Sequence, residues 1–297
     1  SIDLVAGYSD VSSGTVSQLF NVSGAGTVLG ARYNMNFDRV ENYEHKIVFG
    51  LDYKAFQSNV TFVGSSTPLV PDVTVHPVSI TYSGLWRGTT SQLDFFASYS
   101  QNIPGGNDGA QSDFNERKPG YPNPARTDAK AGYNILRAGA NYIHQMWGEW
   151  QAKTSLNIQQ TDAALIAGEQ FGAGGAESVR GFDERAVSND RGWRANFELY
   201  TPDIAGDLGW TGGRAKVLVF YDTADLTRNR RQPGEASGQT ITSYGLGLRV
   251  QTKNVFSMKV DYAQVYHDSE TDNGTPRLIK DGRRNSNTVH ASANWVF

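Results

Sequence analysis

The chain of 297 residues contains no cysteine and no long apolar run. The absence of cysteine excludes disulfides and thiolate metal sites, and it is compatible with an oxidising envelope compartment. No window approaches the roughly 18 uninterrupted apolar residues of a membrane-spanning helix. Charged residues make up only 19% of the chain and the net charge is −3. This balance argues against a nucleic-acid-binding surface.

Catalytic motifs are also missing from the sequence. The pattern has no nucleophile elbow, zinc-protease helix or phosphate loop, and the glycine run Gly172–Gly175 is not followed by a helical pattern. Asp222 and Asp225 lack the ligand spacing of a calcium loop. We therefore expect no enzymatic activity, no cofactor and no metal. The five histidines, none of which lies in a recognisable motif, are His45, His76, His144, His267 and His290.

Alternation of apolar and polar residues with a period of two recurs along the whole chain, whereas helical periodicity is hard to find. At the end of the chain, Val289, Ala291, Ala293, Trp295 and Phe297 alternate with His290, Ser292, Asn294 and Val296. About twelve such segments are centred near residues 5, 31, 49, 81, 96, 138, 154, 197, 219, 246, 261 and 292. The sequence therefore predicts an all-β chain of about twelve strands.

The connections between these segments alternate between short and long. Short ones lie near residues 38–42, 87–91, 145–148 and 252–254, and long polar ones near residues 57–73, 103–128, 163–191, 225–240 and 267–286. The connection at residues 202–213 is longer than the other short ones. Tight turns at one end and long loops at the other are typical of outer-membrane barrels, with the turns periplasmic and the loops outside.

A soluble β-sandwich or propeller would alternate as well, but three features favour the barrel. Many strands reach ten residues or more, which exceeds the usual five or six. Charged residues stand in mid-strand on the polar faces, as a wet lumen allows. Aromatic residues at strand ends suit an interfacial girdle: Tyr8, Tyr53, Tyr99, Tyr142, Tyr200 and Trp295. We predict a transmembrane antiparallel up-and-down β-barrel in the bacterial outer membrane, surrounded by its lipids.

The C-terminal residue Phe297 closes an alternating strand that also contains Trp295. This ending resembles the signal by which outer-membrane barrels are recognised for insertion. It implies the barrel assembly machinery and periplasmic chaperones as partners during biogenesis. Many unrelated chains also end on an apolar strand, and this second interpretation stays open.

The segment Gly168–Trp193 contains Val179, Arg180, Gly181 and Phe182, and Phe220 and Asp222 follow about forty residues later. Positions 220 and 222 share one face of a strand. This pair of motifs resembles the signature of the outer-membrane transporters of two-partner secretion, the TpsB family. These transporters belong to the superfamily of bacterial outer-membrane assembly and translocation barrels. Ala224 departs from the family pattern, which usually has glycine there.

The resemblance implies a pore that exports a large secreted exoprotein from periplasm to cell surface without nucleotide hydrolysis. It also implies that a loop at about residues 161–191 enters the lumen, where Arg180 pairs with Asp222. Barrels of this family have sixteen strands after two polypeptide-transport-associated domains and a plug helix. Residues 1–297 match only the C-terminal part of such a barrel, so we expect those N-terminal modules to be absent from this chain.

Three alternatives remain open. Arg180 could be a solvated loop residue, and Asp222 could pair with any counter-ion in the lumen. Within the superfamily, the chain could insert other barrels into the membrane, a function that five periplasmic domains instead of two would indicate. Outside it, the chain could be a passive diffusion porin, with an open and steady conductance.

Overall fold

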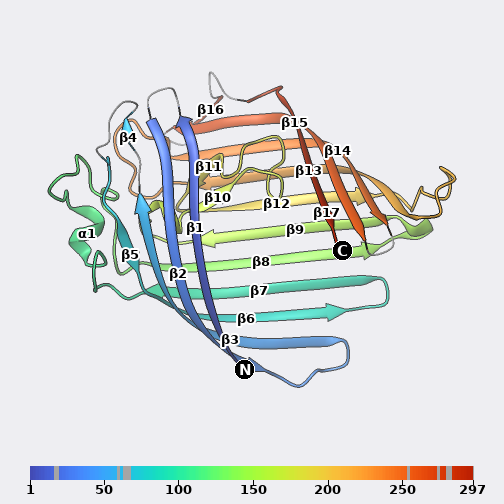
Figure 1. The fold of residues 1–297 in the computed structure, drawn as a ribbon, viewed down its shortest axis with the longest axis horizontal. Coiled ribbons are helices and arrows are strands. Elements are labelled where there is room, and N and C mark those ends of the chain that lie inside the picture. Colours follow the sequence, from blue (N-terminus) through green and yellow to red (C-terminus); the bar gives the residue numbers. More distant parts are fainter. Residues whose placement is uncertain are drawn as a thin grey trace.

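The structure, a computed structural model, describes residues 1–16, 20–58, 61–62, 68–252, 255–272, 275–278 and 283–296. Phe297 lies outside these residues, so its role in assembly stays a prediction. Twelve long strands dominate the described part (Figure 1). They are β1 (Ile2–Val16), β2 (Phe20–Asn36), β3 (Tyr43–Ser58), β6 (Pro77–Arg87), β7 (Ser91–Asn102), β8 (Asn134–Gln145), β9 (Gln151–Gln160), β12 (Arg191–Tyr200), β13 (Gly213–Thr227), β14 (Gly238–Thr252), β15 (Phe256–Asp272) and β17 (Asn287–Trp295).

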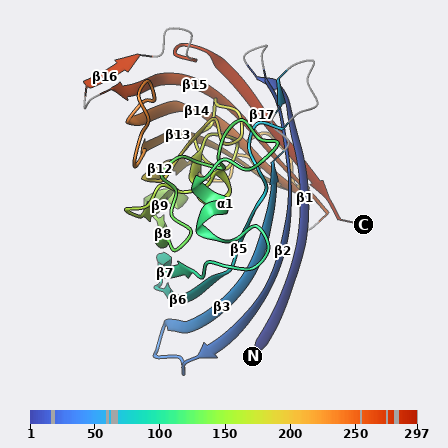
Figure 2. The same cartoon turned by 90° about the vertical axis from the view of Figure 1, so that its left-hand side faces the viewer.

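Each long strand pairs antiparallel with the next long strand of the chain, from β1 through to β17. The result is one continuous up-and-down sheet, which Figure 2 shows strongly curved around an interior. β1 and β17 stand at its two ends, and no pairing joins them among the described residues. The predicted all-β antiparallel architecture of about twelve strands is therefore confirmed.

Short elements lie mainly in the long connections. β4 (Thr61–Phe62), β5 (Val73–Val75) and β16 (Thr275–Leu278) extend the sheet locally, and β10 (Phe171–Ala173) pairs with β11 (Val187–Asn189) in a separate hairpin. The helical turns are α1 (Gln111–Asn115), η1 (Trp147–Glu149) and η2 (Ala167–Glu169). No helix in the described ranges is long and apolar enough to cross a membrane.

Cross-strand register sorts the side chains onto two faces of the sheet. Leu248 lies opposite Val260, and both belong to the apolar outer face on which Leu246 is exposed. Arg249 lies opposite Lys259 on the inner face. An exposed row of large apolar side chains is stable only against an apolar medium. The outer face therefore suits a bilayer, and the inner face carries the charges.

Five of the six predicted girdle aromatics are exposed on the outer face: Tyr8, Tyr53, Tyr99, Tyr142 and Trp295. The prediction for Tyr200 is wrong, because even-numbered positions of β12 point inward. Its hydroxyl donates to Glu198 Oε2 at 2.8 Å, and its ring packs against the buried inner-face residues Leu218, Phe220 and Ala263.

The connection that carries β10 and β11 lies within the interior of the curved sheet, and the connection that carries α1 lies at the long-loop end of the strands (Figures 1 and 2). One buried apolar cluster joins three of the long connections to the sheet, and its largest members are Phe114, Tyr133, Ile135 and Leu165. The sequence pattern did not reveal this cluster, because its members are scattered over irregular segments without periodicity. It holds these connections together at the long-loop end of the sheet.

The outer-face assignment predicts that Leu248→Arg destabilises the protein by about 2–4 kcal/mol if this position lies near the bilayer midplane. The measurement is the urea midpoint of unfolding in lipid vesicles, with the folded fraction read from the heat-modifiable migration of the protein on a gel. Lys259→Gln is the control on the inner face and should leave the midpoint unchanged, because the Lys259 side chain is 51% exposed in a weak ion pair. Equal effects of both changes would contradict the assignment.

Candidate functional site: the loop inside the sheet

Residues 161–190, between β9 and β12, form the inserted loop. Its β10–β11 hairpin folds back over the inner faces of β13, β14 and β15. Gly174 and Gly175 adopt φ of 109° and 108°, values that L-residues rarely tolerate, and allow the tight turn at the tip. The loop contributes Ala173, Val179, Phe182 and Val187 to a buried apolar cluster that also holds Ala224, Leu226, Ile241 and Val265 from the strands.

Arg180, at the loop tip, forms a bidentate salt bridge with Asp222 of β13. Nε of Arg180 donates to Asp222 Oδ2 at 2.7 Å, and Nη2 donates to Oδ1 at 2.8 Å. The backbone N–H of Arg180 adds a third bond, to Oδ2, at 3.1 Å. The Asp222 side chain is 0% exposed and the Arg180 side chain is 4% exposed. Such a fork fixes both the position and the orientation of the loop tip.

Further strands complete the surroundings of the guanidinium. Glu198 of β12 accepts from Nη1 at 2.9 Å, and Asp261 of β15 lies 3.6 Å from the same atom. The ring of Phe220 lies beneath the guanidinium, 3.5 Å from its central carbon. Gly245 leaves room for this ring, since a Cβ there would lie 2.5 Å from Phe220 Cζ.

The charges around Arg180 balance. Arg249 Nη1 and Nη2 bind the two Asp261 oxygens at 2.8 and 3.0 Å, and Lys153 lies 3.7 Å from Glu198. Three cations thus face the carboxylates of Asp222, Glu198 and Asp261. Burial alone lowers the pKa of Arg180, but the hydrogen bonds and negative charges of these carboxylates outweigh it and hold that pKa above its ordinary value. The guanidinium therefore stays charged.

Gly181 connects the loop tip to β17. Its N–H donates to His290 Nε2 at 3.0 Å, and its carbonyl accepts from Thr288 Oγ1 at 3.0 Å. Its φ of 94° belongs to the region that favours glycine. A Cβ at this position would come within 3.1 Å of Val265 Cγ2. Glycine is therefore required both by conformation and by space.

The loop also contacts strands on the other side of the interior. Glu169, which is 2% exposed, accepts from Lys54 of β3 at 2.7 Å and from Arg137 of β8 at 3.0 Å. Beside the tip remains a cavity of about 370 Å³ whose lining is mostly polar and charged, including Asn141, Lys153, Glu177, Arg180, Glu198, Arg249 and Asp261. The loop thus reaches across the interior and leaves a polar cavity next to its tip.

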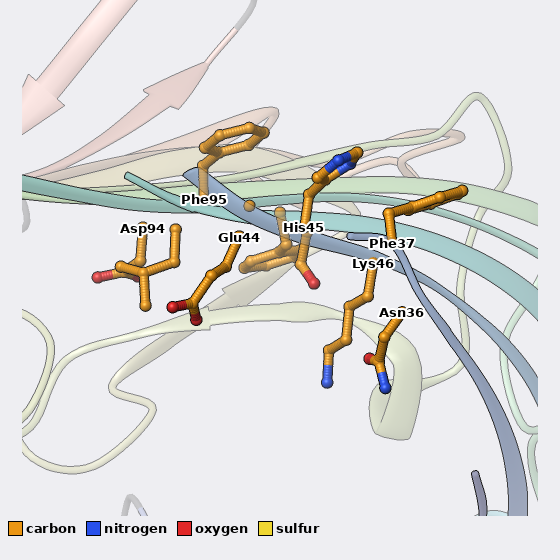
Figure 3. Close-up of a pocket in the computed structure, with 11 residues that line it drawn as sticks. Asn36, Phe37, Glu44, His45, Lys46, Asp94 and Phe95 are labelled. Carbon is orange, nitrogen blue, oxygen red and sulfur yellow. The ribbon is translucent and has the colours of Figure 1, made fainter. Parts of the chain in front are cut away.

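A second hollow, of about 560 Å³, lies at the short-turn ends of β2, β3, β6 and β7 and shares no lining residue with the loop cavity. Figure 3 shows His45 and Phe95 on one side of the strands and Glu44, Lys46 and Asp94 on the other. The His45 ring stacks on Phe37 at 4.8 Å. In the described residues, no cluster of three or more histidine, aspartate or glutamate side chains could hold a metal.

The structure brings together the residues of the two sequence motifs. Arg180 and Asp222 are in contact, Phe220 lies under the guanidinium, and Val179 and Phe182 are buried beside them. Sequence reasoning missed Asn196, which donates to Asp222 Oδ1 at 2.9 Å and to the Ser178 carbonyl. It also missed Glu198, Asp261 and His290 as partners. The polar residues at alternate positions of β12 indicated an inner face. Only the register between neighbouring strands shows which of them lie beside Arg180.

An antiparallel sheet with an apolar outer face, and a charged loop folded against its inner face, defines an outer-membrane β-barrel protein. Residues 7–250 match the model of the family described as haemolysin secretion/activation protein ShlB/FhaC/HecB. The chain belongs to this family of two-partner secretion proteins of the outer membrane. No curated protein sequence matches the chain significantly.

Solved structures agree on the fold. CdiB from Escherichia coli is similar with a TM-score of 0.69 and 16% identity, covering 99% of this chain and 50% of that one. CdiB from Acinetobacter baumannii gives 0.64 and 13%, covering 98% and 47%. BamA from Haemophilus ducreyi lacking POTRA domains 1–3 gives 0.58 and 13%, covering 99% and 59%. The chain thus spans about half the length of these proteins.

The geometry at Gly181 predicts that Gly181→Ala weakens loop docking by about 1–3 kcal/mol, because alanine must adopt a disfavoured φ against Val265. The measurement is limited proteolysis of the folded barrel within the inserted loop. Gly206→Ala is the matched control, since a Cβ there meets nothing within 4 Å. A digestion pattern of Gly181→Ala that equals that of Gly206→Ala would refute this requirement.

Proposed function

We propose that this chain forms the wall of an outer-membrane pore through which a large secreted exoprotein passes from periplasm to cell surface. Family membership supports an exoprotein of the haemolysin type as the partner. No nucleotide is needed in this proposal, because folding of the passenger outside gives the transport its direction. Lipids cover the outer face, and assembly factors and periplasmic chaperones act during biogenesis.

The inserted loop is the gate in this proposal, and the contact between Arg180 and Asp222 is the observation that carries it. A loop that crosses the interior must move before a polypeptide can pass. Its tip is held by one compact charge cluster, which is strong while intact but depends on every member. The long-loop end lies outside the cell and the short-turn end in the periplasm.

A second candidate function is insertion of other barrels into the membrane, which the similarity to BamA favours. The two functions differ in their substrates. Loss of the whole protein should abolish release of one exoprotein and leave other outer-membrane barrels at normal levels. A general loss of barrels from the outer membrane would favour the insertase instead. A passive porin is less well supported, because the loop fills part of the interior.

The gating role predicts that Arg180→Ala and Asp222→Ala each reduce secretion at least about tenfold. Arg180→Ala leaves the buried Asp222 carboxylate without its cation, and Asp222→Ala leaves the Arg180 guanidinium with Glu198 as its hydrogen-bonded carboxylate. Loss of one partner from a buried ion pair costs about 3–5 kcal/mol. The double variant should be no worse than either single one, since the partners share one interaction. Arg180→Lys should also fail, because an ammonium cannot form the fork. The readout is exoprotein in the medium per amount of folded full-length barrel.

Arg185→Ala is the control for that experiment. Arg185 lies exposed on the same loop and its side chain bonds only to Gln170 and Ser188 of that loop among the described contacts. It should secrete normally. Additive losses in the double variant, or normal secretion by Arg180→Ala, would exclude the proposed gate.

A further inference from the structure

Another buried ion pair lies at the root of the inserted loop, away from the tip that carries Arg180. Asp190, the last residue before β12, has a side chain that is 0% exposed. Its two oxygens accept from Nη1 and Nη2 of Arg126 at 2.7 and 2.8 Å. Arg126 belongs to the connection between β7 and β8. This fork therefore joins two long connections through residues that are 64 positions apart in the sequence.

Two further residues complete this arrangement, which we name the base joint: Arg126, Leu165, Asp190 and Asn229. The Asp190 carboxylate also accepts from the backbone N–H groups of Leu165 at 2.9 Å and Asn229 at 2.6 Å. Arg126 donates in turn to the carbonyls of Leu165 and Asn229, each at 2.9 Å. Asn229 lies in the connection between β13 and β14, so three connections meet at one carboxylate.

The base joint also closes the root of the inserted loop. The Asn229 amide donates to the carbonyls of Thr161 and Ala163, both at 2.9 Å. Leu165 and Asp190 stand near the beginning and the end of the loop and are held to each other through the Asp190 carboxylate. Next to the joint, Leu165 and Ile166 pack in the apolar cluster with Phe114 and Tyr133. The root is therefore bound by charge and by apolar burial together.

We propose that Arg126 is a positioning residue for the gate, which holds the root of the inserted loop independently of the contact at its tip. This proposal rests on the gating role proposed above. Release of Arg180 from Asp222 then frees the tip but leaves the root in place. Full opening requires that the base joint opens as well, and the connection between β7 and β8 takes part in the gate.

The energetic reason is the position of Asp190. Without Arg126 its carboxylate would be buried with only neutral donors, an arrangement that favours opening of the joint towards water. Lysine at position 126 supplies the charge but cannot donate in two directions to a carboxylate while also reaching the carbonyls of Leu165 and Asn229. The planar guanidinium is therefore the required group.

Two single-cysteine reporters in the full-length protein test this proposal, since the chain has no cysteine of its own. Ala164→Cys, at a residue 1% exposed beside the base joint, reports on the root, and Ser178→Cys, 5% exposed, reports on the tip. A small charged thiol reagent is added to intact cells, and labelling is normalised to heat-modifiable barrel. We expect Arg126→Ala to accelerate labelling at position 164 at least about tenfold and to leave position 178 unchanged.

Arg180→Ala should produce the reverse pattern, with faster labelling at position 178 alone. Arg117→Ala is the matched control for Arg126→Ala, because Arg117 is exposed on the same connection and its Nε binds only the nearby Tyr121 carbonyl among the described bonds. It should change neither reporter. Arg126→Lys should behave like Arg126→Ala, which separates the fork from a simple loss of charge.

If Arg126→Ala yields too little folded barrel, Asp190→Asn carries the test, since the amide keeps the shape and one acceptor oxygen. Unchanged labelling at position 164 in these variants would overturn the proposal, and so would equal acceleration at both positions. Labelling does not depend on export. A secretion assay in which Arg180→Ala is normal would reject the gate itself, while the reporters would still decide whether Arg126 holds the root.

Discussion

The position of the tip of the inserted loop depends on the fork between Arg180 and Asp222. A buried guanidinium is tolerated only where carboxylates surround it, and β12, β13 and β15 each supply one: Glu198, Asp222 and Asp261. These strands must therefore keep a common register for the loop tip to dock. In return, the loop covers apolar inner-face residues such as Phe220 and Leu226, which would otherwise face a wet lumen.

The inserted loop fills part of the interior, and in the proposed mechanism it is also the part that moves. Burial of its apolar hairpin stabilises the docked loop but does not fix its orientation, because the hydrophobic effect is non-directional. The two forks, at Arg180 and at Asp190, fix where the tip and the root of the loop lie. Glu169 adds contacts to β3 and β8 on the other side of the interior. A loop fixed at separate points can release one part and keep the rest, which is the property that a gate for a long polypeptide needs.

Much of the fold could be predicted from the sequence because strand alternation is a local signal. All twelve predicted segments coincide with long strands, and Arg180 and Asp222 stand in short motifs that a resemblance can identify. Contacts that depend on strand register or on the packing of loops leave no local pattern in the sequence. Asp261 reaches Arg180 only through the order of strands, and Arg126 reaches Asp190 across irregular connections. Residue type alone suggests the outer girdle for Tyr200, whereas the alternation of β12 directs this side chain inward.

The proposed gate requires that the loop occupies the interior at rest and leaves it during export. Pulsed electron paramagnetic resonance tests this directly, with spin labels on Glu177→Cys near the loop tip and Leu208→Cys on the exposed turn between β12 and β13. We expect one narrow distance distribution in the resting full-length protein and its loss when the partner exoprotein is stalled in the pore. A distribution that is broad at rest, or unchanged by the stalled exoprotein, would contradict the proposed gate.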